Sequence, residues 1–408
     1  MYSRLIVDQK LREVAKRGRP FERASLDKSL SMKERFLKLV GADGKFSRDL
    51  SPTEREFTRS ELTICKFDFR YWAERYGTIK RDAQFGAGVG PIEFWESQQR
   101  ALELIGNREE EIYREYEKYS FTDGVLAAWH KSRQLGATAM MRLINMHRMT
   151  MYKNITCLAA SMDEPKVHDL YTKDKLIIDN LPFFLKPTIE FDVKDEHIGF
   201  RSKSSLTYQK SGSQAGIGTG GNWDISHCTE CALWDNAWRL KFDLDPAIPK
   251  AKSTFRSLES TANGRGDNFW FNFTESIRRK DRGFERWLYI FTPCYIASKN
   301  RLPPPDDWRP AEETRRYAEL VENTSAEWVG HTVYPPREHL YWWETEYMQA
   351  EQEMTLHMFL TNHCATPEQS FQNVANSALP VKTIEWMRGT SQLGMPYVIE
   401  STGAKMEV

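Results

Sequence analysis

Two patterns of apolar residues divide the chain near residue 124. Before it, aromatic residues from Phe67 to Tyr76 recur at helical spacing, and the stretch IEFWESQQRALELI predicts a second amphipathic helix. After it, five short apolar runs alternate with longer helical or mixed segments: VLAAW, ITCLAAS, WDISHC, FRSLEST and RWLYIFTP. Such alternation is typical of parallel strands covered by helices. The pattern therefore predicts an α/β fold with a mostly parallel central sheet flanked by helices.

Three parts of the chain differ in composition, and these differences predict the domain organisation. Residues 1–60 are polar and helix-prone, which indicates an N-terminal helical region. Residues 61–300 contain the apolar runs and are expected to form the core domain. The sequence PPPDDWRP at 303–310 interrupts regular structure, so residues 301–408 are expected to form a small lid or linker subdomain. The sequence after residue 372 is irregular, which leaves open whether the chain is a fragment of a longer protein.

Charge and cysteine content narrow the classes of function. The 408 residues include 57 Lys and Arg against 57 Asp and Glu, so no net charge draws the chain to nucleic acid or to a membrane surface. Residues 1–60, with 15 Lys and Arg against 9 Asp and Glu, are a candidate for a local basic contact. The apolar runs are too short to span a membrane, which predicts a soluble intracellular protein. Cys228 and Cys231 are expected at a buried strand end and not in a metal site.

The segment KSRQLGAT follows the first apolar run and resembles a phosphate-binding loop. The usual pattern places a lysine directly before the Ser or Thr that ligates magnesium, but Ala137 occupies that position. Lys131 lies earlier in the loop, and its long side chain can fold back toward Thr138. Arg133 can bind phosphate through two nitrogens, and Gly136 permits close approach of the backbone to an anion. The segment predicts a nucleotide site with a displaced lysine at the N-terminus of a helix.

A second element of the prediction is the pair Thr229 and Glu230, at the end of a later apolar run. Many nucleotide hydrolases carry Asp-Glu here, where the Asp orients magnesium-bound water and the Glu positions the attacking water. Thr229 occupies the position of that Asp. Coordination of a metal at this position would therefore be weaker or mediated by water. Glu230 is the candidate catalytic carboxylate.

Two further elements provide polar side chains that suit a nucleotide. The run SLESTANG brings Ser260, Thr261 and Asn263 to the end of a strand, where hydroxyl and amide groups can contact the terminal phosphate. The same residue types also favour ordinary turns. Upstream, Gln99 can pair with the edge of adenine, and Gln98 is the alternative in another helix register.

The segments SQQRAL, KSRQLGAT, ITCLAAS, TECALWDN, ESTANGRGDNFWFNF and ATPEQSFQ occur in this order. As an ordered set they resemble the ATPase domain of the large terminase subunit, the DNA-packaging motor of tailed bacteriophages. The resemblance covers about residues 60–375. In this family the lysine often lies early in the loop, and Ser or Thr often precedes the catalytic Glu. The resemblance implies a P-loop NTPase fold of the ASCE, or RecA-like, class.

The resemblance also implies roles for individual residues. The nucleotide would be bound by Lys131, Ser132, Arg133, Gln134, Leu135, Gly136, Ala137, Thr138 and Gln99. Glu230 and Arg133 would be catalytic, Thr138 and Glu230 would hold Mg²⁺, and Ser260, Thr261 and Asn263 would couple hydrolysis to movement. An arginine that acts on a neighbouring subunit's ATP is unassigned, with Arg201, Arg256 and Arg265 as candidates.

The implied function is an ATP-hydrolysing motor that translocates double-stranded DNA into a procapsid in the host cytoplasm. ATP and Mg²⁺ are the expected cofactors. The expected partners are double-stranded DNA, the portal protein, the small terminase subunit and further copies in a ring, whereas the isolated chain is expected to be a monomer that binds DNA weakly. The family's nuclease domain does not fit in the residues after 372, which contain no Asp, so nuclease activity is not expected.

Two alternative functions remain at this point. The first is another P-loop DNA translocase or a helicase-like ATPase, which shares the fold and separates strands. The second is a non-catalytic packaging adaptor with a decayed nucleotide site. Ala137 and Thr229 favour the second alternative, since both depart from the usual pattern.

Overall fold

Most of the chain between residues 52 and 372 is described by the computed structural model. The described residues are 52–81, 88–119, 124–182, 184–211, 216–234, 240–264, 270–272, 274 and 287–372, with 397–398 and 405–406. Of the predicted N-terminal helical region, only the beginning of α3 (Pro52–Phe67) falls in these ranges. Arg265 lies outside them.

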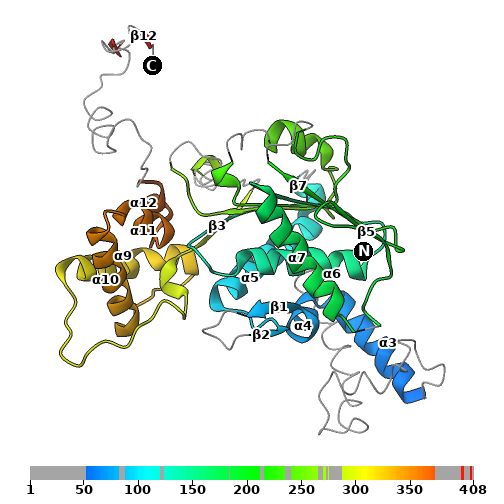
Figure 1. The fold of residues 1–408 in the computed structure, drawn as a ribbon, viewed down its shortest axis with the longest axis horizontal. Helices are drawn as coiled ribbons and strands as arrows, with labels where there is room; N and C mark the ends of the chain where they lie inside the picture. The colour runs from blue at the N-terminus through cyan, green and yellow to red at the C-terminus, as the bar shows by residue number, and fades with distance from the viewer. Residues whose placement is uncertain are drawn as a thin grey trace.

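An eight-stranded sheet forms the centre of the molecule, in the order β10-β3-β9-β8-β4-β7-β6-β5 (Figure 1). Six strands are parallel: β3 (Val125–Lys131), β4 (Thr156–Ser161), β7 (Ser205–Lys210), β8 (Ile225–Thr229), β9 (Phe255–Ser260) and β10 (Leu288–Thr292). At one edge, β6 (His197–Phe200) and β5 (Ile189–Val193) are antiparallel. The five predicted strands are confirmed, and so is the mostly parallel α/β fold.

Side chains of the parallel strands alternate between two apolar cores, as the pleat of a strand requires. In β3, Ala127 and Trp129 contact the core that lies under helices α5 (Glu96–Tyr119), α6 (Ala137–Met151) and α7 (Glu164–Asn180), whereas Ala128 contacts the core on the other face. Because both faces are covered, β3, β8 and β9 are buried along their whole length. Parallel strands with helices on both faces are buried in this way, and the polar residues of β8 and β9 therefore lie inside the protein.

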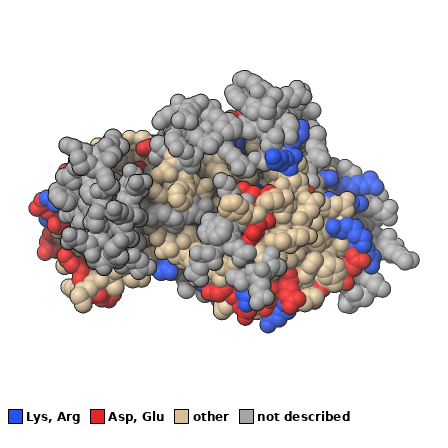
Figure 2. Space-filling view, turned by 90° about the horizontal axis from the view of Figure 1, so that it is seen from above, with Lys and Arg blue, Asp and Glu red and all other residues tan. Residues whose placement is uncertain are grey.

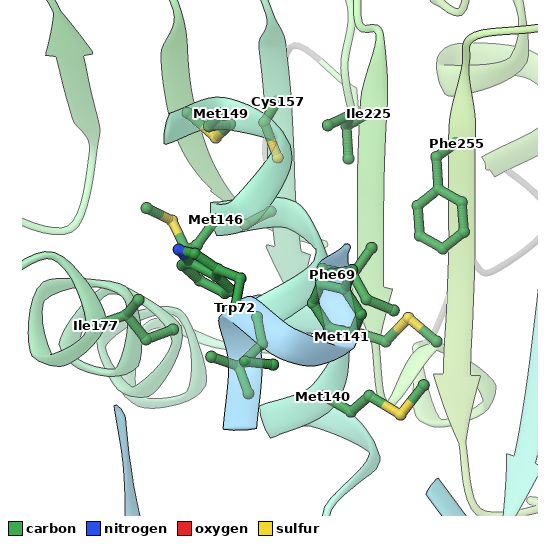
Figure 3. Close-up of a cluster of buried hydrophobic side chains, with 14 of the residues drawn as sticks. Phe69, Trp72, Met140, Met141, Met146, Met149, Cys157, Ile177, Ile225 and Phe255 are labelled. Atoms are coloured by element: carbon green, nitrogen blue, oxygen red, sulfur yellow. The ribbon is translucent and has the colours of Figure 1, made fainter. Parts of the chain in front are cut away.

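Helix α6 lies at the centre of the larger core. Its side chains Met140, Met141, Met146 and Met149 are fully buried, and Figure 3 shows them between the strands and Trp72 of α4 (Phe69–Tyr76). The aromatic residues predicted to form a helix before residue 77 therefore belong to the core. Each such side chain contributes about 1.5–3 kcal/mol when it leaves water. A short antiparallel pair, β1 (Thr78–Arg81) and β2 (Gly88–Pro91), follows α4.

Four described helices follow the parallel strands: α9 (Glu312–Val329), α10 (Arg337–Gln352), α11 (Leu356–Asn362) and α12 (Pro367–Gln372). The first three form a separate apolar cluster, whereas Phe371 of α12 packs in the core on the second face of the sheet. At the centre of the separate cluster the rings of Tyr317 and Trp343 stack at a centroid distance of 4.4 Å. The segment 303–310 contains no helix or strand, as its prolines indicated. In Figure 1 these helices lie beside the end of the sheet to which β3 points.

The described surface carries mixed charge. Figure 2 shows Lys and Arg on the same face as Asp and Glu, with neither kind covering it. Within the described residues, no helix combines the length and the apolar character that crossing a membrane requires.

Candidate active site

The candidate residues meet where β3, β9 and β8 end side by side. All three strands run in the same direction, and the register aligns Glu259 of β9 with Trp129 on one side and Thr229 on the other. The loop after β3 leads into α6 at this edge. Polar side chains at the carboxyl ends of parallel strands face a shared crevice, which is where ligands bind in folds of this kind.

The loop between β3 and α6 contains two residues in the left-handed backbone region. Gly136 caps α6 with a φ of 69°, and Gln134 has a φ of 59°. The positive φ favours glycine at position 136, and a side chain there would displace the Gln98 amide from its contact with the loop. The free N–H groups of the first turn of α6 and the positive end of its dipole lie at this point and favour an anion.

The two upstream glutamines both contact the backbone of the chain. The Gln98 amide donates to the carbonyl of Gly136 at 3.0 Å and accepts from the N–H of Trp95 at 3.0 Å. The Gln99 amide donates to the carbonyl of Phe94 at 3.0 Å. Gln98 therefore braces the loop directly, and the assignment of Gln99 to adenine stays a prediction.

Lys131, at the end of β3, lies between two carboxylates. Its Nζ is 3.1 Å from Oε1 of Glu230 and 3.5 Å from Oε2 of Glu259. Burial alone would lower the pKa of Lys131, but the two carboxylates outweigh burial and hold its pKa above the usual value. The displaced lysine is therefore a charged group at the candidate site, next to the candidate catalytic carboxylate.

Glu230 is held in an unusual backbone conformation directly after β8. Its φ of 53° is in the left-handed region, which costs about 1–3 kcal/mol for a residue with a side chain. About a quarter of its side chain, 25%, is exposed, in contrast to the buried Lys131. Strain of this kind is typical of functional sites, because the fold must compensate for it elsewhere. The turn makes Glu230 accessible beside the lysine.

Glu259 also belongs to the site, although it was not predicted from the sequence. Its side chain is fully buried, and Oε1 accepts hydrogen bonds from the hydroxyls of Thr138 and Thr229, the latter at 2.6 Å. Burial alone would raise the pKa of Glu259, but Lys131, His227 and Thr138 hold that pKa well below its usual range. The signal was present in FRSLES, since a glutamate inside a buried strand needs charged or hydrogen-bonding partners.

The predicted coupling residues lie at the same edge and make different contacts. Ser260 donates to Oε2 of Glu230 at 3.4 Å, and the Asn263 amide donates to the carbonyl of Ala232 at 3.2 Å. Thr261, which lies between these two residues in the sequence, is also buried. Ser260 and Asn263 thus contact Glu230 and the turn that follows it, whereas the role of all three in coupling stays a prediction.

The remaining loop residues connect the site to the C-terminal helices. The N–H of Arg133 donates to the carbonyl of Asn362 at 2.9 Å, and the hydroxyl of Ser132 lies 3.5 Å from the carbonyl of Cys364. The Arg133 side chain is exposed, so it does not belong to the buried charged cluster. Its catalytic role stays a prediction. Gln134 is also exposed and accepts from Lys299 at 2.9 Å.

A buried histidine at the end of β3 forms a further contact with the C-terminal helices. The Nε2 atom of His130 lies 3.1 Å from the hydroxyl of Ser370, and its Nδ1 atom lies 2.5 Å from the hydroxyl of Tyr289. Burial, with a smaller effect of Lys131, lowers the pKa of His130 to about 3, so the ring is neutral. The segment PEQSFQ therefore packs directly on the strand that carries the lysine.

The structure excludes one of the three candidates for the arginine that acts on a neighbouring subunit. Arg256 is buried in β9, ion-paired with Asp245 and stacked on Trp287 at 5.0 Å, so its side chain cannot reach another subunit. Arg201 is exposed after β6, at the opposite edge of the sheet from the loop. Arg256 was a wrong candidate because its position in the sequence does not show that its side chain is buried.

The site suits a magnesium ion that enters with a phosphate. Among the described residues no group of three His, Cys, Asp or Glu forms a metal site by itself. Magnesium usually takes one or two protein oxygens, with water and substrate phosphates completing its shell. Thr138, Glu230 and Glu259 supply such oxygens, and Oε2 of Glu259 is buried without a hydrogen-bond partner among the described groups. These residues fit the ion.

The cysteine pair plays a structural part. Cys228 and Cys231 are both buried and unbonded to other cysteines, at the end of β8 and in the turn after it. Burial raises the pKa of the Cys228 thiol to about 12. A thiol that keeps its proton is a poor metal ligand.

Searches against family models and curated proteins found no match. Among solved structures, the HK97 bacteriophage large terminase matches 73% of this chain and 54% of its own length, with 10% identity and a TM-score of 0.47. A large terminase from a thermophilic bacteriophage, in complex with ATP-gamma-S, matches 52% of this chain and 48% of its own, with 14% identity and a TM-score of 0.32. The Thermus phage P74-26 large terminase ATPase domain matches 47% and 84%, with 11% identity and a TM-score of 0.31. The chain spans about half the length of the first two, and all three are phage large terminases, the family that the sequence motifs indicated.

Proposed function

We propose that the chain is the ATP-hydrolysing motor domain of a viral genome-packaging terminase, which translocates double-stranded DNA into a procapsid in the host cytoplasm. One observation carries the proposal: Lys131 and Glu230, which are 99 residues apart in the chain, lie 3.1 Å apart at the N-terminus of α6. A decayed site would not be expected to retain a buried lysine between two carboxylates beside a glycine-capped helix. Ala137 and Thr229 therefore do not argue for the adaptor alternative.

The chemistry follows from the charges of the chain itself. Lys131 is paired with carboxylates, and the terminal phosphates of ATP would offer it a stronger anionic partner. Its departure would leave Glu230 free to orient a water molecule and accept a proton from it. Magnesium, when bound, would shield the phosphate charge, and Thr138, Glu230 and Glu259 are the oxygen donors that would hold it directly or through water. Catalysis by such a site is mainly charge stabilisation and positioning.

A conformational change at the site would be transmitted to the rest of the protein through two sets of contacts. Ser260 and Asn263 contact Glu230 and its turn, so a change at Glu230 would be transmitted to β9 and beyond. The Arg133 N–H and the Ser132 hydroxyl contact the residues around α11, so a change in the loop would move the C-terminal helices. These contacts support the coupling of hydrolysis to motion.

The expected partners follow from the resemblance to terminases and from the balance of charge. Several copies in a ring on the portal protein, aided by the small terminase subunit, would hold DNA through its phosphates without reading sequence. Binding of duplex by the isolated, neutral chain would be weak and would fall further with salt.

The test is steady-state ATP hydrolysis, with and without duplex DNA, by the wild type, Lys131→Ala and Glu230→Ala. Each site variant is expected to lose about 10²-fold or more, as is usual when a charge-stabilising or proton-accepting group is removed. Lys203→Ala and Glu190→Ala are matched controls, because these residues form an exposed ion pair on the far side of the sheet. Both controls should retain wild-type rates, and thermal melts would verify folding.

Three results would contradict the proposal. Equal activity of the wild type and both site variants would place hydrolysis elsewhere. Unwinding of a forked duplex would favour the helicase-like alternative. Absence of both hydrolysis and ATP binding would favour the non-catalytic adaptor.

A further inference from the structure

Thr229 leaves the end of β8 without the acidic residue that many nucleotide hydrolases carry there, yet a carboxylate is present one strand away. The register pairs Thr229 with Glu259 of β9, and the Thr229 hydroxyl donates to Glu259 at 2.6 Å. We propose that Glu259 replaces the missing acid and is a positioning residue for magnesium in the nucleotide site. The proposal rests on the proposed ATPase function.

The contacts of Glu259 orient a hydroxyl for a cation. Thr138, in the first turn of α6, donates its proton to Oε1 of Glu259. A hydroxyl that donates to a carboxylate keeps its lone pairs for a cation, and the negative partner makes its oxygen a better ligand. Partners of this kind fix the orientation of metal ligands and typically affect metal affinity by about 10–100-fold.

The charge on Glu259 is only partly compensated before a ligand binds. Oε2 has no hydrogen-bond partner among the described groups, and the nearest cation, Lys131, lies at 3.5 Å. If Lys131 moves to a phosphate, a fully buried carboxylate loses that cation, which is strongly unfavourable. Glu259 and the Thr138 hydroxyl would then be available to hold a divalent ion, whose charge would compensate the carboxylate when nucleotide binds.

A buried network holds Glu259 in place. His227 lies with Nε2 3.5 Å from Oε1 of Glu259 and with Nδ1 3.4 Å from a guanidinium nitrogen of Arg142. Because arginine can only donate, Nδ1 must accept, and the proton of the neutral ring lies on Nε2, facing Glu259. Oε1 of Glu259 thus faces His227 and the two threonines, and Oε2 faces Lys131.

The experiment is a titration of a fluorescent ATP analogue into the wild type and Glu259→Gln, across a range of Mg²⁺ concentrations and in EDTA. The amide keeps the shape of the side chain and can still accept from both threonines. We expect the Mg²⁺ concentration for half-maximal effect to rise about 10–100-fold. In EDTA we expect the variant to bind the analogue at least as tightly as the wild type, since one negative charge beside Lys131 is gone.

The proposal predicts a higher Mg²⁺ requirement together with undiminished binding in EDTA. A folding defect would instead weaken binding of the analogue in both conditions. An unchanged Mg²⁺ requirement, with normal binding by the wild type, would overturn the role of Glu259 and leave the proposed ATPase intact. Absence of binding by the wild type in both conditions would overturn the two together. Adding Thr229→Asp to Glu259→Gln should restore the wild-type Mg²⁺ requirement, because it returns a carboxylate to this edge.

If Glu259→Gln does not fold, Thr229→Val tests the same link. It removes a hydroxyl that fixes Glu259 and leaves the carboxylate in place. A raised Mg²⁺ requirement, smaller than that expected for Glu259→Gln, with unchanged binding in EDTA, would support the proposal. No rise would overturn it.

Discussion

Two buried groups of charged residues lie close together in this protein, and they differ in how completely their hydrogen bonds are satisfied. Arg142 of α6 and Asp174 of α7 are fully buried and paired at two points, with nitrogen–oxygen distances of 2.9 and 2.5 Å, and Tyr208 donates to Asp174 at 2.8 Å. By contrast, Lys131 lies 3.1 and 3.5 Å from its two carboxylates.

The difference separates a structural ion pair from a binding site. The Arg142 guanidinium and Asp174 carboxylate hold α6, α7 and β7 together and leave little capacity for a ligand. At the end of β3 the two carboxylates exceed the lysine in charge, Glu230 is partly exposed, and Oε2 of Glu259 has only the 3.5 Å contact with Lys131 and no hydrogen bond among the described residues. A buried charge without full compensation is costly, and this is the physical reason for placing the proposed nucleotide site here.

The largest effect is expected from breaking the structural pair. Asp174→Asn leaves Arg142 buried without its counter-charge, and we expect the free energy of unfolding to fall by about 3–5 kcal/mol. Urea unfolding followed by circular dichroism measures this. Glu230→Gln is the matched control, because it also neutralises a carboxylate beside a buried cation but leaves Lys131 paired with Glu259. Its expected change is below about 1 kcal/mol, as for other partly exposed pairs. Equal destabilisation by the two variants would remove the distinction between the groups.

A smaller effect is expected at His227, which connects the two groups. Burial lowers its pKa, so the folded protein keeps the ring neutral while the unfolded chain takes up a proton near pH 6.5. Stability is therefore complete above that pH and falls as the pH decreases below it, by up to about 1.4 kcal/mol per pH unit for each such histidine. In His227→Gln, whose amide can face Glu259 and accept from Arg142, the dependence below pH 6.5 should be shallower. Urea unfolding at several pH values measures the slope, and an unchanged slope would mean that His227 does not remain neutral in the fold.

Five strands of the sheet, β3, β4, β8, β9 and β10, were predictable, because they are largely buried on both faces. The edge strand β5 was not, since its sequence IEFDV is largely exposed and forms no apolar run. Its pairing with β6 depends on the neighbouring strand and not on its own composition. Local patterns predict strands where burial dictates them, and an exposed edge leaves little trace in the sequence.

The candidate site was predictable in part, for a similar reason. Lys131, Thr138 and Glu230 could be found because a loop and a strand end carry their chemistry within a few residues. Glu259 could not be assigned in the same way, since its importance depends on the strands that flank β9. The choice between Gln98 and Gln99 likewise depended on how α5 packs against the loop.

The most direct test of the account is a calorimetric titration of ATP, with magnesium, into the wild type and Lys131→Ala. If the incompletely paired charges form a nucleotide site, the wild type will bind one ATP per chain. The variant will bind at least tenfold more weakly, since a charged hydrogen bond to phosphate contributes about 1.5–3 kcal/mol. Equal binding by the two proteins, or none by the wild type at millimolar ATP, would contradict the account.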